Sequence, residues 1–183
     1  MDANRQKQIS KLLSLILRHH PESIDLSLDE EGWANVDELL SKLPLKFVFM
    51  SFEELAFLVE NNDKKRFSFS ADTSKIRANQ GHSLDVNLQL APQKPPAVLF
   101  HGTVQRFIEA ISTEGLSKMS RQYVHLSKDE GTAIKVAERR GKPIVLKVNA
   151  EQMYQDGYYF YCSDNGVWLT EAVPTNYIEI PLF

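Results

Sequence analysis

The segment at residues 90–97 constrains the fold of this 183-residue chain more than any other, because its three prolines stand within five positions. Proline fixes φ and has no N–H group, so the segment cannot continue a helix or a central strand. We predict that residues 91–97 form a stiff, extended linker. A chain of this length is long enough for one large domain or two small lobes. The linker favours two lobes, residues 1–90 and residues 98–183.

The first lobe opens with a helical pattern. Asp2 is a candidate N-cap, and the apolar residues between positions 9 and 17 recur at the spacings of one helical stripe. Pro21 disfavours the α conformation at His20, so the helix should end there. Asn35 and Ser51 each precede a glutamate by three residues. This spacing is typical of a capping box and predicts two further helices.

After these helices the pattern of side chains changes to a period of two. Residues 66–70 and 75–77 alternate as two strands around a turn, which predicts a β-hairpin. Three helices followed by a two-stranded hairpin are the element order of a winged-helix module. Fold alone indicates nucleic-acid contact only weakly.

The second lobe mixes helices and strands. Residues 98–100 are predicted as a buried strand that breaks at His101-Gly102-Thr103, after which Thr103 would cap a helix that ends at Gly115. We expect further strands at residues 123–126, 144–148, 158–162, 166–170 and 177–180, and helices at residues 129–140 and 151–155. The predicted fold class is therefore α+β. Neither a Rossmann nor a P-loop glycine motif is present, so those two phosphate cradles are excluded.

Cysteine usage and hydropathy narrow the class of protein further. Cys162 is the only cysteine, which excludes an internal disulfide and a multi-cysteine zinc site. The longest apolar stretches are far shorter than the roughly 20 residues of a membrane-spanning helix, and the first residues do not resemble a signal peptide. We expect a monomeric, cytoplasmic protein that does not bind a membrane.

The charge is close to balanced in both lobes. Residues 1–90 contain 11 Lys and Arg against 14 Asp and Glu, a net charge of −3, and residues 91–183 contain 10 of each. Neither half has the broad basic surface of a protein that coats nucleic acid. A polyanion must then be held locally, and residues 64–77 carry a local net charge of +4. Such a cluster is more often a solvated face than a binding site.

The histidines are the most specific candidates for a binding site in the sequence. None of the five forms an H-x₃-H or H-E-x-x-H pair, so a metal site is disfavoured. His101 is followed by Gly102 and Thr103, where a ligand could approach bare backbone beside a hydroxyl and an imidazole. His125 precedes Ser127 by two residues and offers a similar pair of groups that suit a ribose. The alternative for each is an ordinary hydrogen-bonded imidazole.

The arginines of the sequence indicate a phosphate-binding site. Arg18 and His19 place five fixed donors beside a group that can carry a proton near pH 7. With Arg66 and Arg121 they could bind a phosphate monoester, because guanidinium groups match phosphate oxygens bidentately. An arginine at a helix end also complements the helix dipole, which is the alternative for Arg18. Separation in the sequence leaves open whether these side chains meet.

Seven blocks of the sequence together resemble the RNA 2′-phosphotransferase family of the Tpt1/KptA type. The resemblance extends from about Gln8 to Ile178, and seven blocks in the right order are far more specific than any one of them. The blocks are Leu17-Arg18-His19-His20-Pro21, Asp29-Glu30-Glu31-Gly32-Trp33, Asp63-Lys64-Lys65-Arg66-Phe67, Ile76-Arg77-Ala78-Asn79-Gln80-Gly81-His82-Ser83, Leu99-Phe100-His101-Gly102-Thr103, Tyr123-Val124-His125-Leu126-Ser127 and Asn165-Gly166-Val167-Trp168-Leu169-Thr170.

The resemblance implies both a fold and a reaction. It implies an N-terminal winged-helix lobe that engages RNA and a C-terminal ADP-ribosyltransferase-like lobe that binds NAD⁺. The implied reaction removes an internal RNA 2′-phosphate, left at a splice junction such as those of tRNA splicing, and transfers it to NAD⁺ without a metal. It passes through a 2′-phospho-ADP-ribosylated RNA and gives 2′-OH RNA, nicotinamide and ADP-ribose 1″,2″-cyclic phosphate.

The resemblance also implies roles for individual residues. The catalytic set is carried over to Arg18, His19, Arg66 and Arg121, with the arginines on the phosphate and His19 exchanging a proton. The NAD-binding core is carried over to His101, His125 and the apolar Val167, with Gly102, Thr103, Ser127 and Arg139 as further NAD contacts. The residues that would face RNA or the cleft between the lobes are Lys64, Lys65, Arg77, Gln80 and His82. The alternative for His82 is a structural hydrogen bond.

Two other functions are compatible with the same sequence. The first is an ADP-ribosyltransferase that modifies phosphate ends of nucleic acids or a protein and stops after the first step. The second is a winged-helix DNA-binding regulator whose C-terminal lobe senses a nucleotide. The mild acidity of residues 1–90 counts against the regulator, because duplex binding favours a broad basic face.

Overall fold

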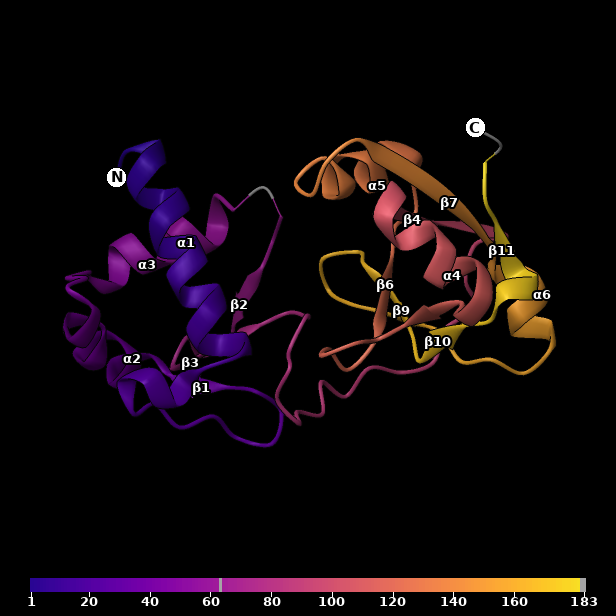
Figure 1. Ribbon diagram of the computed structural model, residues 1–183. Helices are drawn as coiled ribbons and strands as arrows, with labels where there is room; N and C mark the ends of the chain where they lie inside the picture. Colours follow the sequence, from indigo (N-terminus) through magenta and orange to yellow (C-terminus); the bar gives the residue numbers. More distant parts are fainter. Residues whose placement is uncertain (63, 182–183) are drawn as a thin grey trace. The chain divides into compact units, whose positions relative to one another are not determined.

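The computed structural model describes residues 1–62 and 64–181. Its contacts divide the chain into two units, Met1–Gln89 and Leu90–Phe183, and each is described by itself (Figure 1). Both contain helices and small antiparallel sheets, so the chain is an α+β protein, as predicted.

The helices of the first unit begin where the sequence predicts them. Helix α1 (Ala3–Arg18) is capped by the Asp2 carboxylate, which accepts the N–H groups of Asn4 and Arg5 at 2.9 Å each. Helix α2 (Val36–Lys42) is capped by Asn35, and α3 (Phe52–Glu60) has both hydrogen bonds of a capping box. Short 3₁₀ helices lie at Pro21–Ile24 and Leu43–Lys46. These caps satisfy N–H groups that have no partner within the helix.

The predicted hairpin is also confirmed. Strand β2 (Phe67–Phe69) pairs antiparallel with β3 (Lys75–Ala78). A third strand, β1 (Ala34–Asn35), pairs with the other edge of β3, so the sheet order is β1-β3-β2. The sequence did not indicate β1, because two residues are too short to show a period. A core without solvent exposure holds the unit together, formed by Leu13, Ile16, Leu17, Leu39, Leu43, Leu55 and Ile76.

The described residues of the second unit, up to position 181, form three small antiparallel sheets. Strand β7 (Pro143–Asn149) lies between β4 (Val98–Val104) and β11 (Ile178–Glu179). Strand β9 (Trp168–Thr170) lies between β6 (Val124–Leu126) and β8 (Tyr161–Cys162), and β5 (Leu116–Ser117) pairs with β10 (Ala172–Val173). A bridge between Phe100 and Ser127 brings β4 against the end of β6. This bridge places the two predicted NAD histidines on neighbouring strands.

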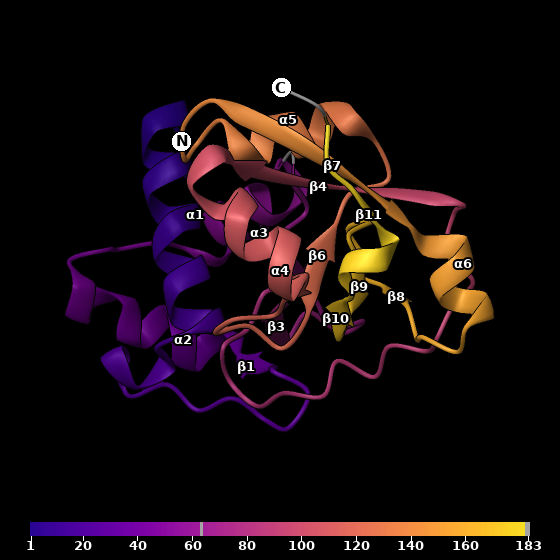
Figure 2. The same cartoon turned by 45° about the vertical axis from the view of Figure 1, so that its right-hand side comes forward.

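The helices of this unit are short. They are α4 (Ile108–Glu114), α5 (Glu130–Ala137) and α6 (Ala150–Gln155), with 3₁₀ helices at Gln105–Phe107 and Thr175–Tyr177. Helix α5 packs on β4 and β7, and Figure 2 shows it lying along these two strands. Asp129 caps α5, and the helix ends at Ala137 rather than at residue 140 as predicted, because residues 138–140 form a turn.

The prediction for the first strand of the second unit is wrong. The strand that begins at Val98 does not break at His101-Gly102-Thr103, because these residues pair with Leu146, Val145 and Ile144 on β7 and β4 continues to Val104. Thr103 therefore caps no helix, and neither α4 nor the 3₁₀ turn before it has a side-chain cap. Pairing with a seven-residue neighbour satisfies the backbone here, and that outweighs the local polarity of the segment.

The proline-rich segment lies within the second unit and is hydrogen-bonded to later residues of that unit. The N–H of Gln93 donates to the carbonyl of Phe160 at 2.8 Å, and the carbonyl of Ala97 accepts from the N–H of Glu151 at 3.1 Å. Lys94 lies 3.8 Å from the Glu151 carboxylate. No helix forms between residues 90 and 97. The prolines thus leave the backbone extended, and hydrogen bonds hold it on the second unit.

Candidate functional site

The end of helix α1 carries two of the predicted catalytic residues. Arg18 is the last helical residue, and His19 is the C-cap, whose N–H donates to the carbonyl of Leu15 at 3.1 Å. Ser83 closes this end from another part of the chain: its N–H donates to the carbonyl of Arg18 at 3.0 Å, and its hydroxyl lies 2.9 Å from His19 Nδ1. The first unit therefore holds Arg18 and His19 in defined positions.

Arg66 is also held against α1. Its Nη1 donates to Ser10 Oγ and to Asn62 Oδ1, at 3.3 Å each. Ser10 precedes Arg18 by eight residues, which is about 12 Å along a helix that rises about 1.5 Å per residue. The carbonyl of Arg66 accepts from Asn79 at 2.9 Å, which ties the start of β2 to the segment that leads to Ser83. Arg18, His19 and Arg66 thus all lie along α1.

His82 is buried, with 1% of its surface exposed. Its predicted place facing RNA or the cleft between the lobes stays a prediction. Burial and the nearby charges of Arg18, His19 and Arg77 lower the pKa of His82 to about 4. The imidazole is therefore neutral at pH 7. Gly32 lies beside the ring: a Cβ at that glycine would make an ordinary contact with His82 Nε2, at 3.4 Å.

The other predicted RNA contacts are spread along the hairpin and the segment after it. Lys64 and Lys65 are exposed, and Gln80 is half-buried. The guanidinium of Arg77 lies over the ring of Trp33, 4.4 Å from its centroid. This stacking orients a cation at the surface of the sheet. A role of these four residues in RNA binding stays a prediction.

In the second unit, Arg121 and the histidines His101 and His125 come together. His101 Nδ1 lies 3.1 Å from the carbonyl oxygen of His125, and Arg121 Nη1 lies 3.0 Å from His125 Nδ1. A carbonyl only accepts and a guanidinium only donates. His101 must therefore carry a proton on Nδ1, whereas the Nδ1 of His125 accepts and its proton is on Nε2. The two rings are held in opposite tautomers.

Arg140 adds a second cation to this group. Burial lowers the pKa of His101, and the nearby Arg140 and Arg121 lower it further. Burial and the charge of Arg140 also lower the pKa of Arg121. Within residues 1–62 and 64–181, neither arginine forms an ion pair with a carboxylate. The group has an excess of positive charge, which suits an anionic ligand.

The remaining predicted NAD contacts differ in accessibility. The side of Gly102 that would bear a side chain is occupied by α5, because a Cβ there would lie 2.0 Å from the carbonyl oxygen of Ala133. Thr103 is 5% exposed, and Ser127 exchanges backbone hydrogen bonds of 2.8 and 2.9 Å with Phe100. Val167 is half-buried, and Arg139 is exposed after the end of α5. Gly102 thus has a packing role, which sequence reasoning missed, and these five roles toward NAD stay predictions.

Two residues near the predicted site were missed. The charge of Arg140 lowers the pKa of His101 and of Arg121, whereas the sequence analysis named its neighbour Arg139 as the NAD contact. Two adjacent arginines before a glycine carry no local signal that separates them. Ser83 was also missed, and its only signal was its position next to His82 in one of the resembling blocks.

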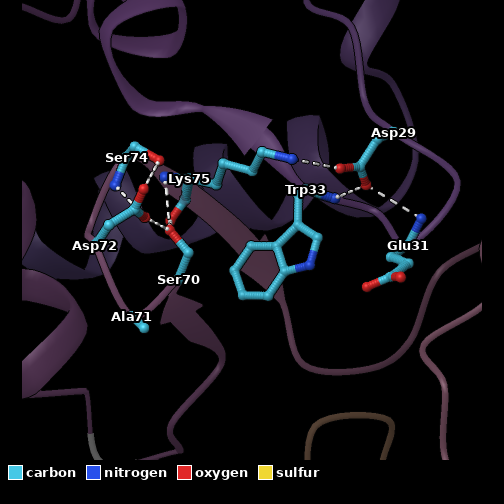
Figure 3. A pocket seen from close by; sticks show the side chains of 8 residues that line it. All are labelled: Asp29, Glu31, Trp33, Ser70, Ala71, Asp72, Ser74 and Lys75. Atoms are coloured by element: carbon cyan, nitrogen blue, oxygen red, sulfur yellow. Dashed lines mark hydrogen bonds and ion pairs between the residues drawn. The ribbon is translucent and has the colours of Figure 1, made fainter.

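The cavities of the first unit lie elsewhere. One of about 510 Å³ is lined by Asp29, Glu31, Trp33, Ser70, Ala71, Asp72, Ser74 and Lys75 (Figure 3). Lys75 Nζ lies 3.0 Å from Asp29 Oδ2, and hydroxyl and N–H donors from Ser70 and Ser74 lower the pKa of Asp72 to about 2. Three carboxylates against one ammonium make this a poor place for an RNA phosphate. A second cavity, of about 330 Å³, lies between α1 and the segment at residues 47–49.

In residues 1–62 and 64–181, no group of three or more His, Cys, Asp or Glu side chains is placed to hold a metal ion. The same residues contain no helix of the length and apolar character needed to cross a membrane.

Comparison with known proteins gives a consistent result. Residues 4–172 match the family model described as RNA 2′-phosphotransferase, Tpt1/KptA family. A probable RNA 2′-phosphotransferase of Flavobacterium johnsoniae is 56% identical over 179 residues, with 98% of both chains covered. Proteins of the same description from Trichormus variabilis and Pectobacterium carotovorum are 52% and 49% identical over 180 residues, which covers 98% of this chain and 99% and 97% of theirs.

Proposed function

Since the chain belongs to the Tpt1/KptA family of RNA 2′-phosphotransferases, enzymes that remove a 2′-phosphate from RNA, we propose that it transfers an internal RNA 2′-phosphate to NAD⁺ in two steps. The observation that carries the proposal is the match over residues 4–172, which includes every residue assigned a role here. The described geometry adds support for the individual roles.

The proposed chemistry balances without a metal or a redox step. First, an oxygen of the RNA 2′-phosphate bonds to C1″ of the nicotinamide ribose while the bond from C1″ to nicotinamide breaks, and nicotinamide leaves. Second, O2″ of that ribose attacks the phosphorus, and the bond from phosphorus to the RNA 2′-oxygen breaks. A proton passes from O2″ to the 2′-oxygen. The products are 2′-OH RNA and ADP-ribose 1″,2″-cyclic phosphate.

We assign the phosphate to Arg18, Arg66 and Arg121, and the proton to His19. Guanidinium groups bind the dianion and stabilise the charge that develops on its oxygens during transfer. An imidazole can both take the proton from O2″ and return it to the 2′-oxygen. The side-chain contacts of His19 with Ser83 and of Arg66 with Ser10 support these roles, because catalysis requires fixed groups rather than mobile ones.

NAD⁺ fits the residues of the second unit. His101 with its proton on Nδ1 can accept a ribose hydroxyl at Nε2, whereas His125 with its proton on Nε2 can donate to one. The excess positive charge of Arg121 and Arg140 suits a pyrophosphate. Arg140 is therefore a candidate beside Arg139. Val167 presents no carboxylate, which fits an acceptor that is already an anion. Bound NAD⁺ would supply an activated ribose carbon.

We also propose that the first unit is the RNA-binding lobe, built as a winged helix, and that the second is an ADP-ribosyltransferase-like lobe. The order of three helices followed by a hairpin and the sheet order β1-β3-β2 support the first assignment. The paired histidines on neighbouring strands support the second. The exposed Lys64 and Lys65 would then contact the RNA backbone.

One experiment tests the proposed function. The full chain is incubated with NAD⁺ and a short RNA that carries an internal 2′-phosphate, and nicotinamide, the RNA 2′-end and the cyclic phosphate are followed. We expect all three products in equal amounts. A lasting RNA–ADP-ribose adduct would favour the transferase that stops after the first step. No release of nicotinamide would refute both enzymatic functions and leave the nucleotide-sensing regulator.

A further inference from the structure

We propose that Ser83 is a positioning residue for His19, and that its hydroxyl holds the imidazole in the plane in which it exchanges a proton with the substrate. The inference rests on the proposed function, because it gives His19 a helper in that reaction. No role in catalysis or binding was predicted for Ser83.

The geometry that supports this is a double attachment at the end of α1. The carbonyl of Arg18 is among the last four of the helix, which have no partner within it. The Ser83 N–H donates to this carbonyl at 3.0 Å. From the same residue, the hydroxyl oxygen lies 2.9 Å from His19 Nδ1. The backbone bond thus sets the place of Ser83, and the side chain then sets the orientation of the ring.

The segment that carries Ser83 is itself well anchored. Asn79 donates its N–H to the carbonyl of Arg66 at 2.9 Å and its side-chain amide to the carbonyl of Lys65 at 2.7 Å. His82 is buried at 1% exposure, and Val86 at 8%. Ser83 therefore lies between anchored residues, so its hydroxyl is presented from a constrained backbone.

A hydroxyl suits a histidine that must gain and lose a proton. It can donate to Nδ1 when that nitrogen is bare and accept from it when it carries a proton. A carboxylate in the same place would favour the protonated ring and raise its pKa. With Nδ1 bound to Ser83, the proton exchange with the substrate takes place at Nε2. The contact therefore orients the ring without holding it in one charge state.

The test compares Ser83→Ala with Ser83→Thr. Ser41→Ala is the control, since Ser41 is an exposed serine whose hydroxyl donates to the carbonyl of Glu38 within α2. Loss of one neutral hydrogen bond in the transition state corresponds to about a two- to tenfold fall in kcat. We expect that fall in Ser83→Ala, with KM for NAD⁺ unchanged, and near wild-type rates in Ser83→Thr and Ser41→Ala. Equal rates in Ser83→Ala and the wild type would overturn the proposal.

A double-mutant cycle separates positioning from a general structural effect. In a His19→Ala background, Ser83→Ala should cause no further loss, because the residue acts through the missing ring. Independent losses that multiply would overturn the proposal.

A third measurement does not depend on turnover. In the full chain without substrate, the nitrogen NMR signals of the His19 ring should shift in Ser83→Ala and not in Ser41→Ala. An unchanged ring signal refutes the contact even if the enzyme is active. A wild-type chain that releases no nicotinamide refutes the proposed function, whatever the ring signal shows.

Discussion

Gly102 offers the clearest quantitative test of the structure around the predicted NAD residues. A Cβ at this position would lie 2.0 Å from the carbonyl oxygen of Ala133 and 2.8 Å from its carbonyl carbon. Ordinary contacts with a Cβ are longer than about 3.4 Å, so α5 would have to move from β4 by more than about 1 Å. Both clashing atoms belong to the backbone, so no change of side-chain rotamer relieves the contact. Overpacking of this kind costs about 1–3 kcal/mol, and we expect Gly102→Ala to lie at the upper end.

Urea unfolding of the full chain measures this loss. The chain contains two tryptophans, Trp33 in the first unit and Trp168 in the second. In a Trp33→Phe background, fluorescence reports on Trp168 and hence on the second unit alone. We expect the free energy of unfolding to fall by about 3 kcal/mol, which corresponds to a fall in Tm of more than 10 °C, since about 1 kcal/mol shifts the Tm of a 60–100-residue unit by about 4–8 °C.

The matched control is Gly131→Ala, in the first turn of α5. A Cβ at Gly131 would meet only Asp129 Oδ1, at 3.4 Å, and alanine favours helix more than glycine does. This variant should be as stable as the parent or slightly more so. If Gly102→Ala unfolds within about 0.5 kcal/mol of its parent, the close packing of α5 on β4 is refuted.

Three further predictions follow from the described contacts. Burial lowers the pKa of His82 to about 4, whereas its pKa in the unfolded chain is about 6.5, so the unfolded state binds more protons between these two pH values. The free energy of unfolding of the first unit should therefore fall by about 3 kcal/mol as the pH falls from 6.5 to 4. The same dependence on pH in His82→Gln would contradict this. Ser51→Ala removes the cap of α3 and should lower the free energy of unfolding by about 1 kcal/mol in urea, whereas a loss no larger than that of Ser41→Ala would mean that the cap contributes nothing. His101→Ala should raise KM for NAD⁺ and leave binding of the 2′-phosphorylated RNA unchanged by fluorescence titration; an unaltered KM and kcat would remove His101 from the NAD site.

Local signals in the sequence were sufficient for the helices of the first unit. The caps at Asp2, Asn35 and Ser51 were predicted because a capping bond joins residues two or three positions apart. The β2–β3 hairpin was predicted for the same reason, since its turn brings neighbouring residues together. In each case the residues that decide the structure are close in the chain.

Predictions failed where the deciding partner was distant in the chain. The polar residues after Phe100 suggested a break, but β7, more than 40 residues later, pairs with them and continues the strand. Gly102 also has a packing role that no local pattern indicated, because α5 occupies the side on which a side chain would lie. The effect of the Arg140 charge on the pKa values of His101 and Arg121 likewise depends on residues that are distant in the chain. None of these partners is visible in a local pattern.

The amino-acid sequence alone determined the family, the candidate residues and the helix starts of the first unit, because motif order and capping are properties of the chain itself. Only the tertiary structure decided that His82 is buried, that Ser83 contacts His19, and that His101 and His125 have opposite tautomers. A side chain acquires its burial and its hydrogen-bond partner from residues that folding brings near it. Its charge state and orientation, and therefore its chemistry, are set only at that stage.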